Sequence, residues 1–251
     1  MRFCRAEAQG ELFYGIIEGD IVARLSGAPY EGYARDGRVY DLQRVKLLAP
    51  AEPSKIVAVG KNYLAHALEM KEGVPAEPLL FLKPSTCVIG PDDAIVYPRL
   101  SKRLDYEAEL GVVIGKRCMN VQPGGSAGVI FGYTCLNDVT ARDIQKGDPQ
   151  WTRGKCFDTF CPIGPWIETE LDPACVQVES RLNGELRQSA KTDMLIHSID
   201  RLITYITACM TLLPGDIVAT GTPEGVGPML IGDVIEVSVE GVGILKNTVG
   251  A

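Results

Sequence analysis

The chain has 251 residues, of which 46% are hydrophobic and 23% are charged, and its formal net charge is −7. This composition is typical of one sizeable globular domain, or of one domain with a small appendage, and it argues against disorder. The negative charge argues against a general nucleic-acid or acidic-membrane surface, so an anionic ligand must be attracted by a few local cations. The candidate cations are Lys61, Lys83, Arg142 and Lys155.

Cysteine usage favours a reducing compartment. The eight cysteines form no C-x-x-C pair, and Cys135 and Cys209 lie in apolar runs where a thiol behaves as a small hydrophobic side chain. The start of the chain lacks the apolar core of a signal peptide, and the sequence has no apolar run of about 18 residues, the length that spans a membrane. We therefore predict a cytoplasmic protein without a membrane partner.

Short strand-like segments separated by glycine-containing turns occupy the first part of the chain, at residues 13–17, 21–25 and 39–42. They predict a small β domain over residues 1–50. Residues 49–53 are a candidate linker, because Pro50 and Pro53 disfavour both helix and central strand. Residues 51–251 would then form the main domain.

A histidine and a glutamate follow the first strand of that main domain. The strand, residues 55–59, leads into a glycine turn and a short helix that is predicted to continue through Met70. His66 and Glu69 stand three residues apart on this helix, so their side chains share a face and can hydrogen-bond. A glutamate that fixes the histidine tautomer and raises its basicity is a simple general-base device. The alternative is an exposed surface pair.

The segment 104–115 predicts a strand, because apolar residues occupy every second position. The alternation places Asp105, Glu107 and Glu109 together on the opposite face. Two carboxylates about 4 Å apart repel by roughly 4 kcal/mol at an effective dielectric near 20, and a divalent cation is the simplest remedy. A solvated strand face is the alternative.

Histidine is scarce, with two in the chain, so a metal site must be built from oxygen ligands. Oxygen ligands favour Mg²⁺, Mn²⁺ or Ca²⁺ over zinc. Asp138 ends the next predicted strand, residues 129–136 followed by Asn137, and is a further candidate ligand. Its alternative role is to cap a helical turn over residues 139–145, on which Arg142 and Gln145 would face the same way.

Lys155 is the notable residue of an irregular segment, residues 151–158. A lysine close to a reacting oxygen could stabilise developing negative charge, and the alternative is a surface lysine with a buried stem. Further along, Asn183-Gly184 predicts a hairpin between strands 176–182 and 185–189.

The last part of the chain begins with Ser198, which can cap a helix over residues 199–210. The glycine-rich segment 220–228 lacks the spacing of a phosphate loop, but its backbone N–H groups could bind a carboxylate; a plain turn is the alternative. Strands at residues 234–239 and 242–247 complete the prediction.

Four of these motifs together resemble the fumarylacetoacetate hydrolase superfamily. They are Gly60-Lys61-Asn62-Tyr63 with His66 and Glu69, the segment Leu104 to Leu110, Asn137-Asp138 with Arg142, and the segment Thr220 to Pro228. The resemblance extends from Lys55 to Val249 with the motifs in the expected order. Residues 1–50 resemble the small extra domain of bacterial members named 2-hydroxyhepta-2,4-diene-1,7-dioate isomerases.

The resemblance implies a mostly β fold with some α (α+β), a mixed β-sandwich roll that is usually a homodimer. It implies Mg²⁺ or Mn²⁺, with Ca²⁺ as an alternative ion, bound by Glu107, Glu109 and Asp138, with Asp105 behind them. Catalytic roles would fall to His66 and Glu69, on a lid that orders with ligand, and to Lys155. Substrate contacts would come from Lys61, Tyr63, Arg142, Gln145 and Thr222.

We hypothesise that the metal chelates a 2-oxo or 2,4-dioxo acid, including dicarboxylic ones, and favours an enolate. Water activated by His66 would then break a C–C bond of an acylpyruvate-type substrate. Isomerisation of a 2-hydroxyhepta-2,4-diene-1,7-dioate and decarboxylation of a β-keto acid such as oxaloacetate pass through the same enolate, so both stay open. A non-catalytic protein that sequesters Ca²⁺ or a small acid is a third hypothesis. The expected partner is a small 2-oxo acid and not nucleic acid.

Overall fold

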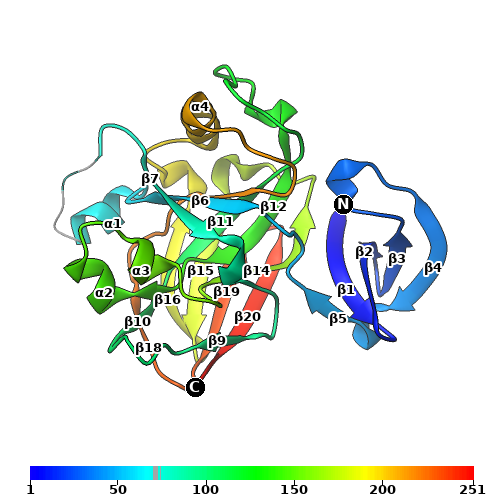
Figure 1. Cartoon of the computed structure of the whole chain (residues 1–251), viewed down its shortest axis with the longest axis horizontal. Helices are drawn as coiled ribbons and strands as arrows, with labels where there is room; N and C mark the ends of the chain where they lie inside the picture. The colour runs from blue at the N-terminus through cyan, green and yellow to red at the C-terminus, as the bar shows by residue number, and fades with distance from the viewer. Residues whose placement is uncertain (70–72, 74) are drawn as a thin grey trace.

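The computed structural model describes residues 1–69, 73 and 75–251. Strands dominate it and helices are few and short, which confirms the mostly β class with some α. Figure 1 shows a large lobe that carries the helices and the C-terminus, and a smaller lobe formed by the first strands. No helix among the described residues is long and apolar enough to cross a membrane. Met70, the predicted end of the first helix, lies outside the described residues.

The smaller lobe contains β1 (Arg2–Ala8), β2 (Glu11–Glu18), β3 (Ile21–Leu25), β4 (Arg35–Asp41) and β5 (Lys46–Leu48). Alternation of apolar and polar residues buries one face of these strands in a small core that includes Cys4, Phe13 and Val22. The lobe is not separate in its hydrogen bonding, because β1 pairs with β14 (Cys161–Glu168) of the larger lobe.

The longest sheet runs through both lobes in the order β4-β3-β2-β1-β14-β12-β11-β17-β6-β7. Its members in the larger lobe are β6 (Lys55–Gly60), β7 (Leu79–Pro84), β11 (Ala108–Ile114), β12 (Ile130–Asn137), β14 and β17 (Ile217–Ala219), with β8 (Val88–Ile89) paired to β14. β7 is an edge strand of this sheet, since β6 is its neighbour in the described structure. The buried β11 and β12 form the centre from which the site is built.

A second sheet packs on this centre and makes the sandwich. It contains β16 (Glu185–Lys191), β15 (Gln177–Leu182), β19 (Val234–Val239), β20 (Gly243–Gly250) and β9 (Ala94–Val96), in that order. Val112, Val178 and Val237, one from each of β11, β15 and β19, meet in one buried cluster between the sheets. A small third sheet joins β13 (Thr140–Ala141), β10 (Leu104–Tyr106) and β18 (Gly227–Met229).

Three short helices lie on the same side of the larger lobe in Figure 1: α1 (Leu64–Glu69), α2 (Arg142–Gly147) and α3 (Thr152–Lys155). The longest helix, α4 (Ile199–Cys209), buries Leu202, Ile203 and Ile206 against the sandwich. Ser198 caps it as predicted, because its side chain accepts a bond from the N–H of Arg201. The predicted hairpin is also confirmed, with Asn183 and Gly184 at φ 52° and 82°.

Two predicted elements differ from the structure. The single strand expected over 104–115 is interrupted at Glu107, whose N–H donates to Oδ1 of Asn137. On one side of the interruption β10 joins the small sheet, and on the other β11 joins the long sheet. The helical turn expected over 139–145 is extended through Ala141, and α2 starts after it. Asp138 is therefore not a helix cap.

Candidate metal and acid–base site

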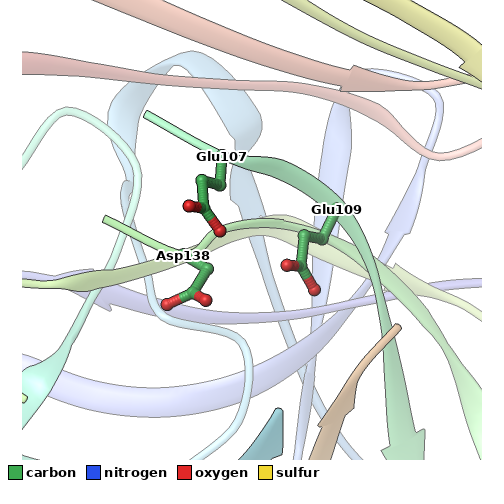
Figure 2. A group of neighbouring side chains, drawn as sticks. All are labelled: Glu107, Glu109 and Asp138. Atoms are coloured by element: carbon green, nitrogen blue, oxygen red, sulfur yellow. The ribbon is translucent and has the colours of Figure 1, made fainter. Parts of the chain in front are cut away.

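Three acidic side chains come together where β11 begins and β12 ends (Figure 2). Glu107, Glu109 and Asp138 each offer one oxygen, and these oxygens lie within 4.8 Å of one another. All three side chains are buried, at 5%, 1% and 1% exposure. The two glutamates share a face because they stand two residues apart in extended backbone. Asp138 joins them because Ala108 pairs with Asn137 across the two strands.

Fixed cations neutralise part of this acidic cluster. Lys155 Nζ lies 2.8 Å from Oε2 of Glu107 and 2.5 Å from Oδ2 of Asp138. Arg142 donates to Glu107 Oε1 at 2.5 Å, and Lys83 donates to Asp138 Oδ1 at 2.5 Å. Burial disfavours the charged form of Glu107, but Lys155 and Arg142 outweigh it and lower the pKa of that carboxyl. Charge balance alone therefore does not require a metal, which corrects the sequence argument.

Glu109 is the carboxylate that these cations leave poorly compensated. Its Oε2 accepts a hydrogen bond from the N–H of Gly221 at 2.8 Å. Burial, followed by the charges of Asp138 and Glu107, raises the pKa of Glu109 well above its usual value. A cation between Glu109 and its two neighbours would remove this cost. The oxygen donor set suits a hard divalent ion such as Mg²⁺ or Mn²⁺, so the residues fit that group.

A histidine faces the acidic cluster across a cavity of about 530 Å³. His66 and Glu69 of α1 both line this cavity, together with the three acidic residues. His66 Nδ1 lies 3.2 Å from Oε2 of Glu69, as the predicted pair requires. With Nδ1 directed at the carboxylate, Nε2 is the nitrogen left to accept a proton. Both carboxyl oxygens of Glu69 also lie 3.3 Å from the N–H of Gly225, which ties α1 to the segment 220–228.

Arg142 connects the acidic cluster to the base of α2. Its guanidinium donates to Asp105, Glu107 and Gln145, so Asp105 acts by holding Arg142 in place. Arg142 and Gln145 do face the same way, and both line the cavity. The bond from Arg142 uses the oxygen of the Gln145 amide and leaves its NH₂ group able to donate to a ligand.

Of the remaining predicted substrate contacts, two line the cavity and one does not. Lys61 and Thr222 line the cavity, whereas Tyr63 does not. Tyr63 is 2% exposed, and its hydroxyl has no hydrogen-bond partner among the described residues. The Thr222 hydroxyl donates to the carbonyl of Ala108 and accepts from Gln188, so its proton is already used. Thr222 can therefore offer an incoming ligand shape and its backbone, but not its hydroxyl proton.

The roles of Lys83 and Asn62 differ from what the sequence indicates. Lys83 is a candidate cation for an anionic ligand, but its side chain is fully buried, donates to Asp138 and also donates to the carbonyl of Lys155. Burial opposes its charge, but Asp138, together with the nearby thiols of Cys161 and Cys87, raises the pKa of Lys83. Asn62 bridges the backbone of His197 and Thr220. These contacts join segments far apart in the chain, so spacing could not reveal them.

Replacing Lys83 with methionine is expected to lower the free energy of unfolding by about 3 kcal/mol. The reason is that Asp138 would stay buried after losing one of its two cationic partners. Urea denaturation of the metal-free protein measures the change. Lys46→Met is the matched control, because the Lys46–Asp93 ion pair is exposed and should contribute less than about 1 kcal/mol. Equal losses in the two variants would contradict the assigned role of Lys83.

A buried carboxylate triad and a histidine–glutamate pair that open into one cavity define an enzyme site able to hold a divalent cation. The chain belongs to the fumarylacetoacetate hydrolase family: the family model described as "Fumarylacetoacetate (FAA) hydrolase C-terminal" matches residues 55–250. A second model, described as "Rv2993c-like, N-terminal", matches residues 1–50.

Three similar proteins carry three different activity names. A solved 5-carboxymethyl-2-hydroxymuconate delta-isomerase from Mycobacterium smegmatis is 44% identical, with a TM-score of 0.94 and coverage of 100% of this chain and 99% of its own. A maleylpyruvate hydrolase from Sphingobium sp. SYK-6, solved with manganese(II) and pyruvate, is 34% identical, with a TM-score of 0.82 and coverage of 100% and 99%. A mitochondrial oxaloacetate tautomerase, FAHD2B of Bos taurus, is 41% identical over 82% of this chain and 69% of its own.

Proposed function

We propose that the protein is a divalent-metal-dependent hydrolase that cleaves a C–C bond of acylpyruvate-type 2,4-dioxo acids. The observation that carries this proposal is the facing of the His66–Glu69 pair and the carboxylate triad across one cavity. Hydrolysis needs both parts, a base for water and an anchor for the 2-oxo acid. The manganese and pyruvate in the similar maleylpyruvate hydrolase support the same pairing of metal with a 2-oxo acid.

The metal would be Mg²⁺ or Mn²⁺, held by Glu107, Glu109 and Asp138. When bound, it supplies Lewis-acid chemistry that favours an enolate over the keto form. Lys155 lies within hydrogen-bond distance of two of these carboxylates, at the edge of the same cavity. Its ammonium would offset the negative charge that develops on the substrate oxygens, a contribution of about 3 kcal/mol for one well-placed donor.

His66 would act as the general base. Glu69 holds Nδ1, so Nε2 can take a proton from water while the resulting hydroxide adds to the carbonyl carbon at C4. The bond between C3 and C4 then breaks, and its electron pair moves into the pyruvate enolate. The proton on His66 returns to C3, which gives pyruvate and the carboxylic acid of the acyl group. Atoms and charge balance without another reactant.

Lys61, Arg142, Gln145 and Thr222 would position the substrate, because all four line the cavity. The amide NH₂ of Gln145 is the group best able to donate to a substrate oxygen, since the amide oxygen is already bonded to Arg142. Tyr63 would act indirectly, because it is buried outside the cavity lining.

Isomerisation or tautomerisation, and decarboxylation of a β-keto acid, are the alternative reactions. The isomerase and tautomerase names of two similar proteins favour the first of these. Each alternative uses the same enolate but needs no water at a distal carbonyl. The three outcomes differ in product mass: hydrolysis adds water, decarboxylation loses carbon dioxide, and tautomerisation leaves the mass unchanged.

The proposal is tested by titrating Mg²⁺, Mn²⁺ and Ca²⁺ into the metal-free protein, followed by oxalate as a mimic of the pyruvate enolate. We expect oxalate to bind at least tenfold more tightly when metal is present. A panel of acylpyruvates, oxaloacetate and unsaturated dicarboxylates with mass detection then identifies the reaction. A protein that binds Ca²⁺ but turns over none of these acids would be the non-catalytic binder and would contradict the proposal.

We also propose that residues 1–50 form a small domain distinct from residues 51–251, and that the protein is a cytoplasmic homodimer. The separate family model for residues 1–50 supports the first point. All eight cysteines are free thiols in the structure, which supports a reducing compartment. Light scattering coupled to size-exclusion chromatography measures the mass in solution, and a monomeric mass would contradict the dimer.

A further inference from the structure

A second hollow, which we call the side groove, lies next to the cavity that holds the acidic triad. It has a volume of about 780 Å³ and is lined by β7, by residues 149–152 that lead into α3, and by Lys55 and Cys156. Phe81 and Trp151 line both the side groove and the cavity. The two hollows therefore share a wall that contains these two rings.

The shared wall is held in place by packing. The rings of Phe81 and Trp151 meet edge to face, with centroids 5.4 Å apart. The indole occupies space that exists because residue 60 is glycine: a Cβ at Gly60 would lie 2.6 Å from the nearest indole carbon. Lys61 Nζ lies 5.8 Å from the centroid of the Trp151 ring. Trp151 thus separates charged groups on one side from the side groove on the other.

The side groove is more apolar than the cavity, which is lined by charged side chains. Leu79 and Leu82, which are 38% and 50% exposed, both line the side groove. Its two lysines are already paired, Lys55 with Asp216 and Lys83 with Asp138. Among the described residues that line the side groove, none offers an uncommitted cation for a second carboxylate. An apolar group would gain by burial there, whereas an ionised group would lose solvation without gaining a partner.

We propose that the side groove binds the apolar tail of the substrate acyl group, with Phe81 and Trp151 as the point where the tail leaves the cavity. This inference rests on the proposed function, and it narrows the substrate class to acylpyruvates with an alkyl or aryl tail of several carbons. Leu82 is then a specificity-determining residue, because it lies in the side groove and away from the reacting atoms.

Binding of N-alkyl oxamates tests the inference without depending on which reaction occurs. Oxamate presents the two oxygens of a 2-oxo acid, and its nitrogen carries linear tails from methyl to hexyl. Calorimetric titration in the presence of Mn²⁺ should show the affinity rising about fourfold for each methylene that enters the side groove, equivalent to about 0.8 kcal/mol. Matched compounds that end in a carboxylate should show no such rise.

Leu82→Asp should reduce the gain per methylene to less than about twofold, because it places a charge where the tail would lie. Leu12→Asp is the matched control, since Leu12 is a similarly exposed leucine on β2, at 56%, outside both hollows. Leu12→Asp should retain the full rise in affinity with each added methylene. Thr152→Trp, which fills the side groove from α3, should shorten the longest tail that still adds affinity.

Three results would overturn the inference. The first is equal affinity for all tail lengths while N-methyl oxamate still binds with metal; this leaves the proposed function intact. The second is a rise with tail length that Leu82→Asp and Thr152→Trp do not alter. The third is a change of mass in light scattering for Leu82→Asp with no tail effect, which would show that a second copy of the chain covers the side groove. Failure of every oxamate and of oxalate to bind contradicts the proposed function instead.

Discussion

Replacing Glu109 with glutamine is expected to weaken divalent-metal binding by at least about 100-fold while making the metal-free protein more stable. The affinity falls because one of three ligands loses its charge, and even residues behind metal ligands affect affinity by about 10–100-fold. Stability rises by about 1 to 4 kcal/mol, since two carboxylates about 4 Å apart repel by roughly 4 kcal/mol at an effective dielectric near 20. The amide can still accept the bond from the Gly221 N–H.

Two measurements on the same variant check this expectation: calorimetric titration with Mn²⁺, and urea denaturation in the presence of a chelator. Asp138→Asn is the comparison, because it also removes a ligand but leaves Lys83 and Lys155 with a neutral partner. We expect it to lose both metal affinity and stability. A Glu109→Gln variant that is less stable than the parent without metal would show that the triad is not a strained ion site.

Replacing His66 with alanine is expected to lower kcat for C–C hydrolysis by 10² to 10⁴, the usual contribution of a general base. Metal and oxalate binding should stay within about twofold of the parent, because no carboxylate of the triad is changed. Any keto–enol tautomerisation that needs no activated water should persist at a higher fraction of the parent rate. Steady-state kinetics with mass detection of both products, together with oxalate titration, measure these effects.

The second histidine gives a matched control. His197 contacts Asn62 through its backbone, and its side chain does not line the cavity, so His197→Ala should retain turnover. Glu69→Gln should lower kcat less than His66→Ala, since the amide can still orient the ring but cannot stabilise its charged form. Hydrolysis at the parent rate in His66→Ala would exclude the base assignment.

Much of the fold follows from local patterns in the sequence. The strand-like segments 21–25 and 234–239 match β3 and β19 to the residue, and Asn183-Gly184 predicted the hairpin. β14 escaped prediction although it lies in the middle of the long sheet, because Pro162, Gly164 and Pro165 argue against a central strand. The sheet accommodates them through a register shift between β12 and β14, a tertiary solution that local patterns do not encode.

The sequence predicts the acidic residues of the candidate site better than it predicts the positions of the cationic ones. Glu107 and Glu109 lie together as alternation predicts, although the predicted strand is interrupted at Glu107, and the His66–Glu69 pair follows from helical spacing. The position of Lys83 beneath Asp138 depends on a contact across 55 residues of sequence, so no local rule could place it. The same is true of Trp151, which meets Phe81 only because the segment before α3 folds back onto β7.

β7 carries three consecutive residues with three different tasks. Phe81 forms part of the wall between the hollows, Leu82 lines the side groove, and Lys83 supports Asp138 from below. Because Leu82 and Lys83 are neighbours on β7, a ligand that displaces the strand at Leu82 would also displace the lysine that supports Asp138, a proposed metal ligand. Thermodynamic reciprocity then requires that tail and ion alter each other's affinity by the same factor. A substrate whose tail binds in the side groove would thus change the affinity for the metal, and the metal would change the affinity for that tail.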